Sequence, residues 1–89
     1  MNRQLTIELD KNGLMWMVLG ECISADKNTN NEERKKSIDT MQDLLASFRE
    51  PDVKAAIKYE NLKKYIKYCQ NGIQLLKREM EKNTEQEQQ

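Results

Sequence analysis

Residues 38–80 read IDTMQDLLASFREPDVKAAIKYENLKKYIKYCQNGIQLLKREM, and this stretch decides the fold. Apolar side chains recur along it at alternating steps of three and four residues, and only Asp52 interrupts the series. Its members are Ile38, Met41, Leu45, Phe48, Ala55, Tyr59, Leu62, Ile66, Cys69, Ile73, Leu76 and Met80. Such spacing places an apolar stripe along one side of a helix, and the stripe needs another surface to cover it. The chain is therefore expected to be mainly α-helical.

Two kinds of structure could cover this stripe. A parallel coiled coil of two copies would bring Lys58 of one chain beside Lys63 of the other, and that contact is repulsive. The core of a helical bundle carries no such penalty, and it is the usual surrounding of a short amphipathic helix. We therefore expect a bundle in which other helices of the same chain cover the stripe.

Pro51 divides the stripe. Proline lacks an amide hydrogen and disfavours helical geometry in the residue before it, but it suits the first turn of a helix. We expect a break or kink at Pro51, between a helix over about 31–49 and a helix over about 52–82, and we favour a break. Asn30, followed by Glu33, has the pattern of an N-cap for the earlier helix.

The N-terminal segment contains a strand pattern followed by a turn signal. Leu5, Ile7 and Leu9 alternate with polar residues, which predicts a short strand over about 4–9. The Asn-Gly pair that comes next is typical of a hairpin, and a hairpin would make residues 14–19 a second strand.

A helical interpretation of the following residues is the stronger one. Apolar residues at helical spacing favour a first helix over about 11–25, with Asp10 as its cap; they are Met15, Val18, Leu19, Cys22 and Ile23. The strand over 4–9 then has no partner within the chain, and the same strand of a second copy is the simplest one. The expected fold is three helices with a short N-terminal strand, in a homo-oligomer for which we favour a dimer.

The length of 89 residues allows one small domain, which we place at residues 1–82. The polar, low-complexity residues 83–89 are expected to be a disordered tail. The pattern of a signal peptide is absent, and the longest apolar run is too short to cross a membrane. Cys22 and Cys69 lie at apolar positions of helical patterns, which is typical of reduced core cysteines, so a cytoplasmic location is expected.

The inventory of reactive side chains argues against an enzyme. The chain contains no histidine, which is the commonest general base and metal ligand. Its two cysteines are far apart in sequence, and its three glycines form no phosphate-binding loop. We therefore expect no catalytic residues, no metal and no cofactor.

The net charge is zero, but the charges are distributed unevenly. Residues 51–78 contain seven Lys and Arg against two Asp and Glu, whereas residues 1–50 contain seven against nine. Lysines neutralise phosphates, and tyrosine rings can stack on bases. The candidate phosphate-binding residues are therefore Lys54, Lys58, Lys63, Lys64, Lys67, Tyr65 and Tyr68. They support one functional hypothesis, a nucleic-acid or nucleotide binder.

The leading hypothesis is a non-catalytic protein-interaction module. Trp16 and Met17 lie away from the apolar line of the first expected helix, so that helix is apolar on most of its circumference. The candidate interface residues, for a partner or for a second copy, are Leu5, Ile7, Trp16 and Met17. We expect a small regulatory or inhibitor-type protein, by analogy with those that phages and plasmids encode.

Overall fold

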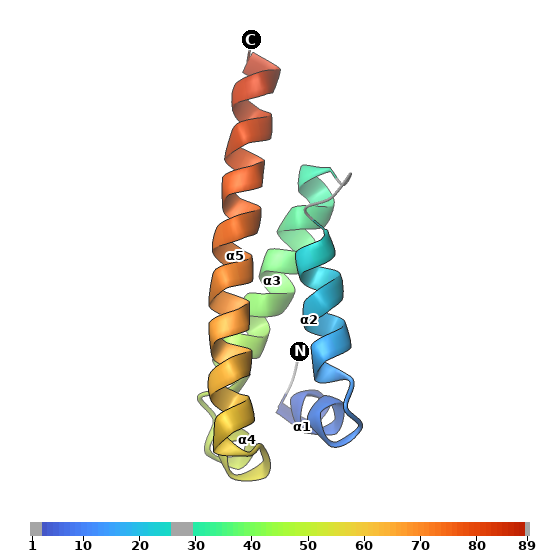
Figure 1. Ribbon diagram of the computed structural model, residues 1–89, viewed down its shortest axis with the longest axis vertical. Helices are drawn as coiled ribbons and strands as arrows, with labels where there is room; N and C mark the ends of the chain where they lie inside the picture. Colours follow the sequence, from blue (N-terminus) through green and yellow to red (C-terminus); the bar gives the residue numbers. More distant parts are fainter. Residues whose placement is uncertain (1–2, 26–29, 89) are drawn as a thin grey trace.

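The computed structural model describes residues 3–25 and 30–88, with side chains up to Lys82 (Figure 1). This part of the chain forms five helices and no strand: α1 (Arg3–Lys11), α2 (Met15–Ser24), α3 (Asn31–Ser47), α4 (Pro51–Ala56) and α5 (Tyr59–Gln88). The molecule measures 49 × 20 × 20 Å. The expectation of a mainly α-helical chain is confirmed, but the expected three helices are too few and the expected strand is not found among the described residues.

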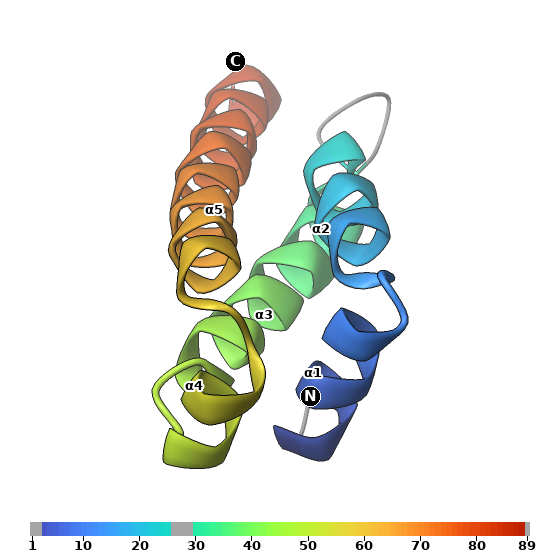
Figure 2. The same ribbon diagram turned by 60° about the horizontal axis from the view of Figure 1, so that its bottom comes forward.

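The long helix α5 forms the spine of the molecule, and α3 packs against it in the opposite direction (Figure 1). The shorter helix α2 lies against both of them. At the lower end, α1 crosses beneath α2 and contacts α4, which leads into α5 (Figure 2). The chain thus closes one end of a three-helix core with two short helices.

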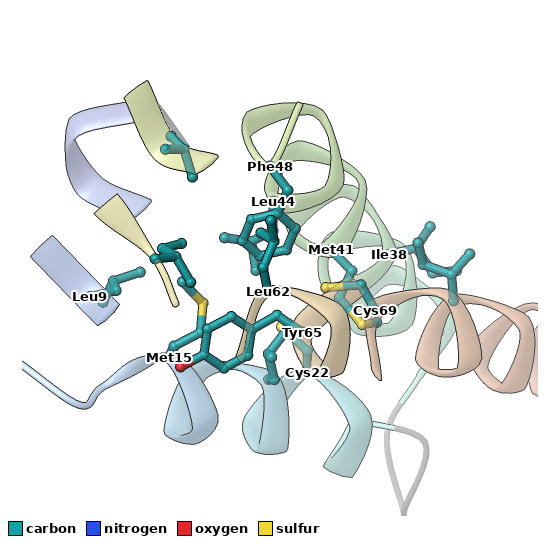
Figure 3. Close-up of a cluster of buried hydrophobic side chains, with 14 of the residues drawn as sticks. Leu9, Met15, Cys22, Ile38, Met41, Leu44, Phe48, Leu62, Tyr65 and Cys69 are labelled. Atoms are coloured by element: carbon teal, nitrogen blue, oxygen red, sulfur yellow. The ribbon is translucent and has the colours of Figure 1, made fainter. Parts of the chain in front are cut away.

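The core contains side chains from every helix. Figure 3 shows Met15 and Cys22 of α2, Met41 of α3, and Tyr65 and Cys69 of α5 converging in it. The buried apolar residues are Leu9, Met15, Leu19, Cys22, Ile38, Met41, Leu44, Phe48, Val53, Ile57, Leu62, Tyr65, Cys69, Ile73 and Leu76. The apolar stripe therefore faces a bundle core over most of its length, as expected. The exceptions are Ala55, which is exposed, and Tyr59, which starts α5 and is 72% exposed.

The predicted strand over 4–9 is wrong, because these residues belong to α1. The alternation of Leu5, Ile7 and Leu9 does not separate buried from exposed positions. Instead the helix buries Thr6 and Leu9, three residues apart, and leaves Leu5 40% exposed. Thr6 tolerates burial because its hydroxyl shares a hydrogen bond of 2.9 Å with the Ser47 hydroxyl. The pairing of this segment with a second copy as a strand loses its basis.

The Asn-Gly pair ends α1 and starts neither a hairpin nor a helix. Gly13 has a φ of +71°, and its amide donates to the Asp10 carbonyl while the Leu14 amide donates to the Leu9 carbonyl. These two bonds form a Schellman motif, in which glycine is favoured because it adopts a positive φ without strain. The expected first helix over 11–25 accordingly begins only at Met15, and Asp10 lies inside α1 and does not cap α2.

The start of α3 and the break at Pro51 are confirmed. The Asn30 side chain accepts a hydrogen bond of 2.9 Å from the Glu33 amide, which is the expected N-cap. Pro51 is the first residue of α4, and Glu50 before it is extended, with a ψ of 136°. The proline therefore separates two helices and does not kink one.

A second break, at Ile57, divides the helix that was expected over 52–82. Ile57 is extended, with φ −103° and ψ 133°, and its side chain is only 3% exposed. Together with Val53, which is also buried, Ile57 holds α4 against the core. Neither residue belongs to the apolar stripe, so the stripe does not predict this contact. At its other end α5 continues past residue 82 and runs to Gln88.

Within the described residues, none of the helices combines the length and the apolar character that a membrane span requires.

Candidate partner-binding surface

The helix α2 points apolar side chains both into the core and out of it. Met15 and Leu19 are completely buried, whereas Trp16 is 43% and Met17 is 61% exposed. Gly20 adds an open position, since a Cβ there would meet nothing within 4 Å. Exposed large apolar groups gathered on one helix of a small protein are typical of an interaction surface.

Trp16 is held in place by an aromatic cluster. Its ring packs edge-on against Tyr65, with centroids 5.0 Å apart, and against Tyr68, with centroids 5.5 Å apart. Phe48 stacks on Tyr65, at a centroid distance of 6.1 Å. Edge-to-face pairs of this kind stabilise one ring orientation. The exposed part of Trp16 is therefore presented in a fixed position between α2 and α5.

Tyr65 belongs to the core and not to an exposed binding face, contrary to its assignment from the sequence. It is only 4% exposed, and its hydroxyl donates a hydrogen bond of 2.7 Å to Asp10 Oδ1. Burial, and then the hydrogen bond and the negative charge of Asp10, raise the pKa of Tyr65 to about 12. Its phenol is thus fully engaged in joining α5 to the end of α1.

The five candidate lysines are all exposed but lie on different elements. Lys54 is on α4, Lys58 is in the connection before α5, and Lys63, Lys64 and Lys67 are on the first turns of α5. The ammonium group of Lys63 lies 5.3 Å from the centre of the exposed Tyr59 ring, which is a cation–π contact. The candidate lysines thus come from three successive segments of the chain.

One line of side chains on α5 connects the two sets of candidates. Lys64, Tyr68, Leu75 and Arg78 follow one another by four, seven and three residues, so they share one side of the helix. Tyr68 contacts Trp16, and Leu75 is 37% exposed. We call these four residues together with Trp16 the α2–α5 surface.

The sequence pattern alone does not identify Leu75 and Arg78 as surface residues of this kind. Leu75 is the neighbour of the buried stripe residue Leu76, and Arg78 follows the lysine block. The signal that could have identified Leu75 is its distance of seven residues from Tyr68. That signal gains meaning only from the contact between Tyr68 and Trp16, which the sequence does not reveal.

Leu5 and Ile7, the other two interface candidates, are on α1 and not on the α2–α5 surface. Leu5 is 40% exposed, whereas Ile7 is half-buried and packs against the core. The structure thus joins Trp16 to Tyr68 but assigns Leu5 and Ile7 to another helix. Met17 is on the outer side of α2, where it borders a shallow hollow with Gly20 and Glu21.

Both cysteines are free and buried. Burial raises the pKa of the Cys22 thiol, and the charge of Glu21 adds to this effect. Burial and the neighbouring Cys22 raise the pKa of the Cys69 thiol to about 12. Because the thiolate is the reactive form, these two thiols are suited to packing and not to nucleophilic chemistry. In the described part of the chain, His, Cys, Asp and Glu form no group of three that could hold a metal ion.

No protein-family model, no curated protein and no solved structure matches this chain.

Proposed function

We propose that this protein is a non-catalytic interaction module that acts by occupying a surface of a partner protein, as small regulatory or inhibitor-type proteins do. The observation that carries the proposal is the exposure of Trp16 and Met17 on a helix whose opposite side is completely buried. Tryptophan is enriched among the residues that dominate binding energy, and methionine adapts to varied partner surfaces.

The energetic argument concerns what these side chains gain in a complex. Complete burial of a large apolar side chain contributes about 1.5–3 kcal/mol relative to leaving it in water. Trp16 and Met17 gain only part of this free energy within the protein, because about half of each side chain remains exposed. Since the aromatic cluster already fixes Trp16, binding would cost little side-chain entropy there.

Site-specific photocrosslinking tests the proposal. A photoreactive phenylalanine analogue at position 17 should crosslink to a discrete protein in an extract of the native host. The same analogue at position 46 is the matched control, because Ala46 is exposed on α3. A protein adduct at position 17 and none at position 46 is the expected result. The absence of an adduct at position 17, or the same adducts at both positions, would contradict it.

The proposal includes self-association into a dimer. Two of the exposed apolar side chains outside α2 support it, namely Leu5 on α1 and Leu14 in the turn, which are 40% and 41% exposed. Neither residue is among those that define the α2–α5 surface, so we propose a dimer that leaves that surface to the partner. Light scattering of the purified protein at tens of micromolar should give twice the mass of 10.5 kDa. A monomeric mass would remove the dimer and leave the interaction module.

Nucleic-acid or nucleotide binding is the second candidate function. It is favoured by the exposed Tyr59 ring beside Lys63, at the end of the molecule where Lys58 is also exposed. An accessible ring next to cations can stack on a base while the cations neutralise phosphates. The burial of Tyr65 removes one of the tyrosines on which this hypothesis first relied.

The salt dependence of binding tests this second candidate. Affinity for single-stranded DNA, RNA or a nucleotide should fall steeply with salt, and replacing Lys58, Lys63 and Lys67 by Glu should abolish it. The same number of Lys→Glu changes on α3, at Lys35 and Lys36, and on α5, at Lys77, provides the control. Binding that does not respond to salt, or that both variants lose equally, would rule out a specific lysine site.

A further inference from the structure

We propose that the α2–α5 surface binds an acidic amphipathic helix of a partner protein. The inference rests on the proposed function, because it names the surface and the chemistry of the partner for an interaction module. It is carried by three features of the described residues: the length of the surface, its uncompensated positive charge, and the fixed apolar groups between the charges.

The length of the surface suits a helix of about four turns. Lys64 and Arg78 mark its ends, and their separation of fourteen positions corresponds to about 21 Å along α5. Tyr68 and Leu75 lie between these cations, two turns apart. A partner helix laid along α5 presents apolar side chains at the same interval, by the i, i+3, i+4 and i+7 pattern of helices that dock in grooves.

The part of the surface on α5 carries positive charge between the flanking Glu60 and Glu79. Between residues 61 and 78, α5 carries five basic side chains and no acidic one. Lys64, Lys67 and Arg78 form no ion pair with any described residue, whereas Lys36 and Lys82 lie 3.5 and 3.4 Å from glutamates on their own helices. Carboxylates of a partner would therefore meet unpaired cations at both ends of the surface, which favours an acidic partner over a basic one.

The apolar groups favour a protein helix over a nucleic acid. Trp16 presents the part of its ring that Tyr65 and Tyr68 do not cover, and Leu75 lies beyond Tyr68 on the same line. A leucine at this place offers a base neither a stacking plane nor a hydrogen bond. It does offer a contact to Leu, Ile or Phe of an amphipathic helix, while Trp16 is suited to be the anchor of the interface.

Selection from a displayed peptide library tests the proposal directly. The probe is a library of random helix-forming peptides of about 18 residues, enough for five turns. The bait is the intact chain, with counter-selection against the triple variant Lys64→Glu/Lys67→Glu/Arg78→Glu. All three side chains are exposed and unpaired among the described residues, so the variant should fold. Selected peptides should be acidic, with apolar residues at i, i+3 or i+4, and i+7.

The single tryptophan provides a readout at the surface itself. A selected peptide without tryptophan should shift Trp16 emission to the blue as it covers the ring. Binding to the triple variant should be at least about tenfold weaker, because three charge contacts become repulsive. The matched control variant, Lys35→Glu/Lys36→Glu/Lys54→Glu, has the same net charge and should bind as the wild type does.

Three outcomes would overturn the inference. The first is that the selected peptides are neutral or basic, and the second is that they bind both triple variants equally. The third is that single-stranded DNA of about 20 nucleotides produces the same Trp16 shift and competes with the peptides, which would assign the surface to nucleic acid. A protein adduct at position 17, in the photocrosslinking test, together with any of these outcomes would preserve the interaction module and reject only the acidic helix.

Discussion

Helices α1 and α2 are nearly equal in length, nine and ten residues, but they are attached to the same core in different ways. Polar contacts at both ends and in the middle fix α1. Arg3 approaches Glu50, Thr6 shares a hydrogen bond with Ser47, and Asp10 accepts one from Tyr65. In the described structure no side chain of α2 forms a hydrogen bond, and apolar packing alone holds this helix.

The comparison shows that a small core can fix the position of one helix by polar contacts and still leave apolar side chains of another helix uncovered. Directional polar contacts determine where α1 lies, so few of its apolar groups are needed for attachment. The attachment of α2 depends on shape and apolar area, and its sequence carries more apolar side chains than the core can cover. The surplus, Trp16 and Met17, remains at the surface. The predictions below test this comparison, from the largest expected effect to the smallest.

Two methionines of α2 provide the sharpest test. Met15 is completely buried and Met17 is 61% exposed. Met15→Ala should lower the free energy of unfolding by about 2–5 kcal/mol, because it removes buried apolar area and leaves a cavity. Met17→Ala should change it by no more than about 0.5 kcal/mol. Urea unfolding of both variants measures the effects, and equal losses would show that the outer side of α2 is structural.

The hydrogen bond between Tyr65 and Asp10 tests the polar attachment of α1. Tyr65→Phe should cost about 1.5 kcal/mol, because Asp10 loses a donor in a partly buried place.

The same bond makes a specific prediction about pH. The folded protein raises the pKa of Tyr65 from 10.0 to about 12, so the protonated phenol is favoured in the native state. The stabilisation that follows from this raised pKa is complete below pH 10 and is lost as the pH rises from 10 to 12. The Tm difference between the wild type and Tyr65→Phe should therefore shrink over this interval. A constant difference would mean that the phenol is not held by Asp10.

Two glycines test the close packing of α2. A Cβ at Gly72 would lie 2.8 Å from Met41 Sδ and 3.0 Å from Ile23 Cγ1, where α2, α3 and α5 meet. Gly72→Ala should therefore destabilise the protein by about 1 kcal/mol, since crowding outweighs the gain in helix propensity. Gly20→Ala, which has open space, should stabilise it by up to about 1 kcal/mol. Thermal unfolding distinguishes the two signs, and stabilisation by both changes would contradict the close approach.

The ion pairs of Arg3 should contribute least. Its guanidinium lies 3.3 Å from Glu50 and 3.8 Å from Asp52, but all three side chains are largely exposed. Arg3→Gln should lower stability by about 0.5 kcal/mol or less, and added salt should remove the difference. A larger loss in high salt would show that Arg3 orients α1 by packing and not by charge.

Features that depend on local chemistry could be predicted from the sequence. Asn30 caps α3 and Pro51 starts α4, because each effect involves only neighbouring residues. The apolar stripe of α5 faces the core for the same reason, since helical periodicity is a local property. The predictions that are wrong concern positions whose conformation or burial depends on residues far away in the sequence. Thr6 is buried because Ser47 lies opposite, and Ile57 leaves the helical conformation to bring its side chain into the core.

In the candidate site too, local features could be predicted from the sequence, whereas contacts between helices could not. Exposure of Trp16 and Met17 could be anticipated from their place outside the apolar line of their helix. The partnership of Trp16 with Tyr68, and the burial of Tyr65, depend on how α2 and α5 approach each other. No pattern within either helix carries that information. The sequence therefore indicated some residues of the surface on each helix, and the packing of α2 against α5 brings them together.

Because Cys22 and Cys69 are buried, the reactivity of their thiols reports on the opening of the core. Their side chains are 8% and 0% exposed, and the pKa of both thiols is raised, so alkylation must wait until the core opens. The rate at which the two thiols are modified in native buffer would thus measure how often α2 separates from α5. A cysteine introduced at the exposed Asn71 would react at once, and a probe could be attached beside Tyr68 without disturbing either native thiol.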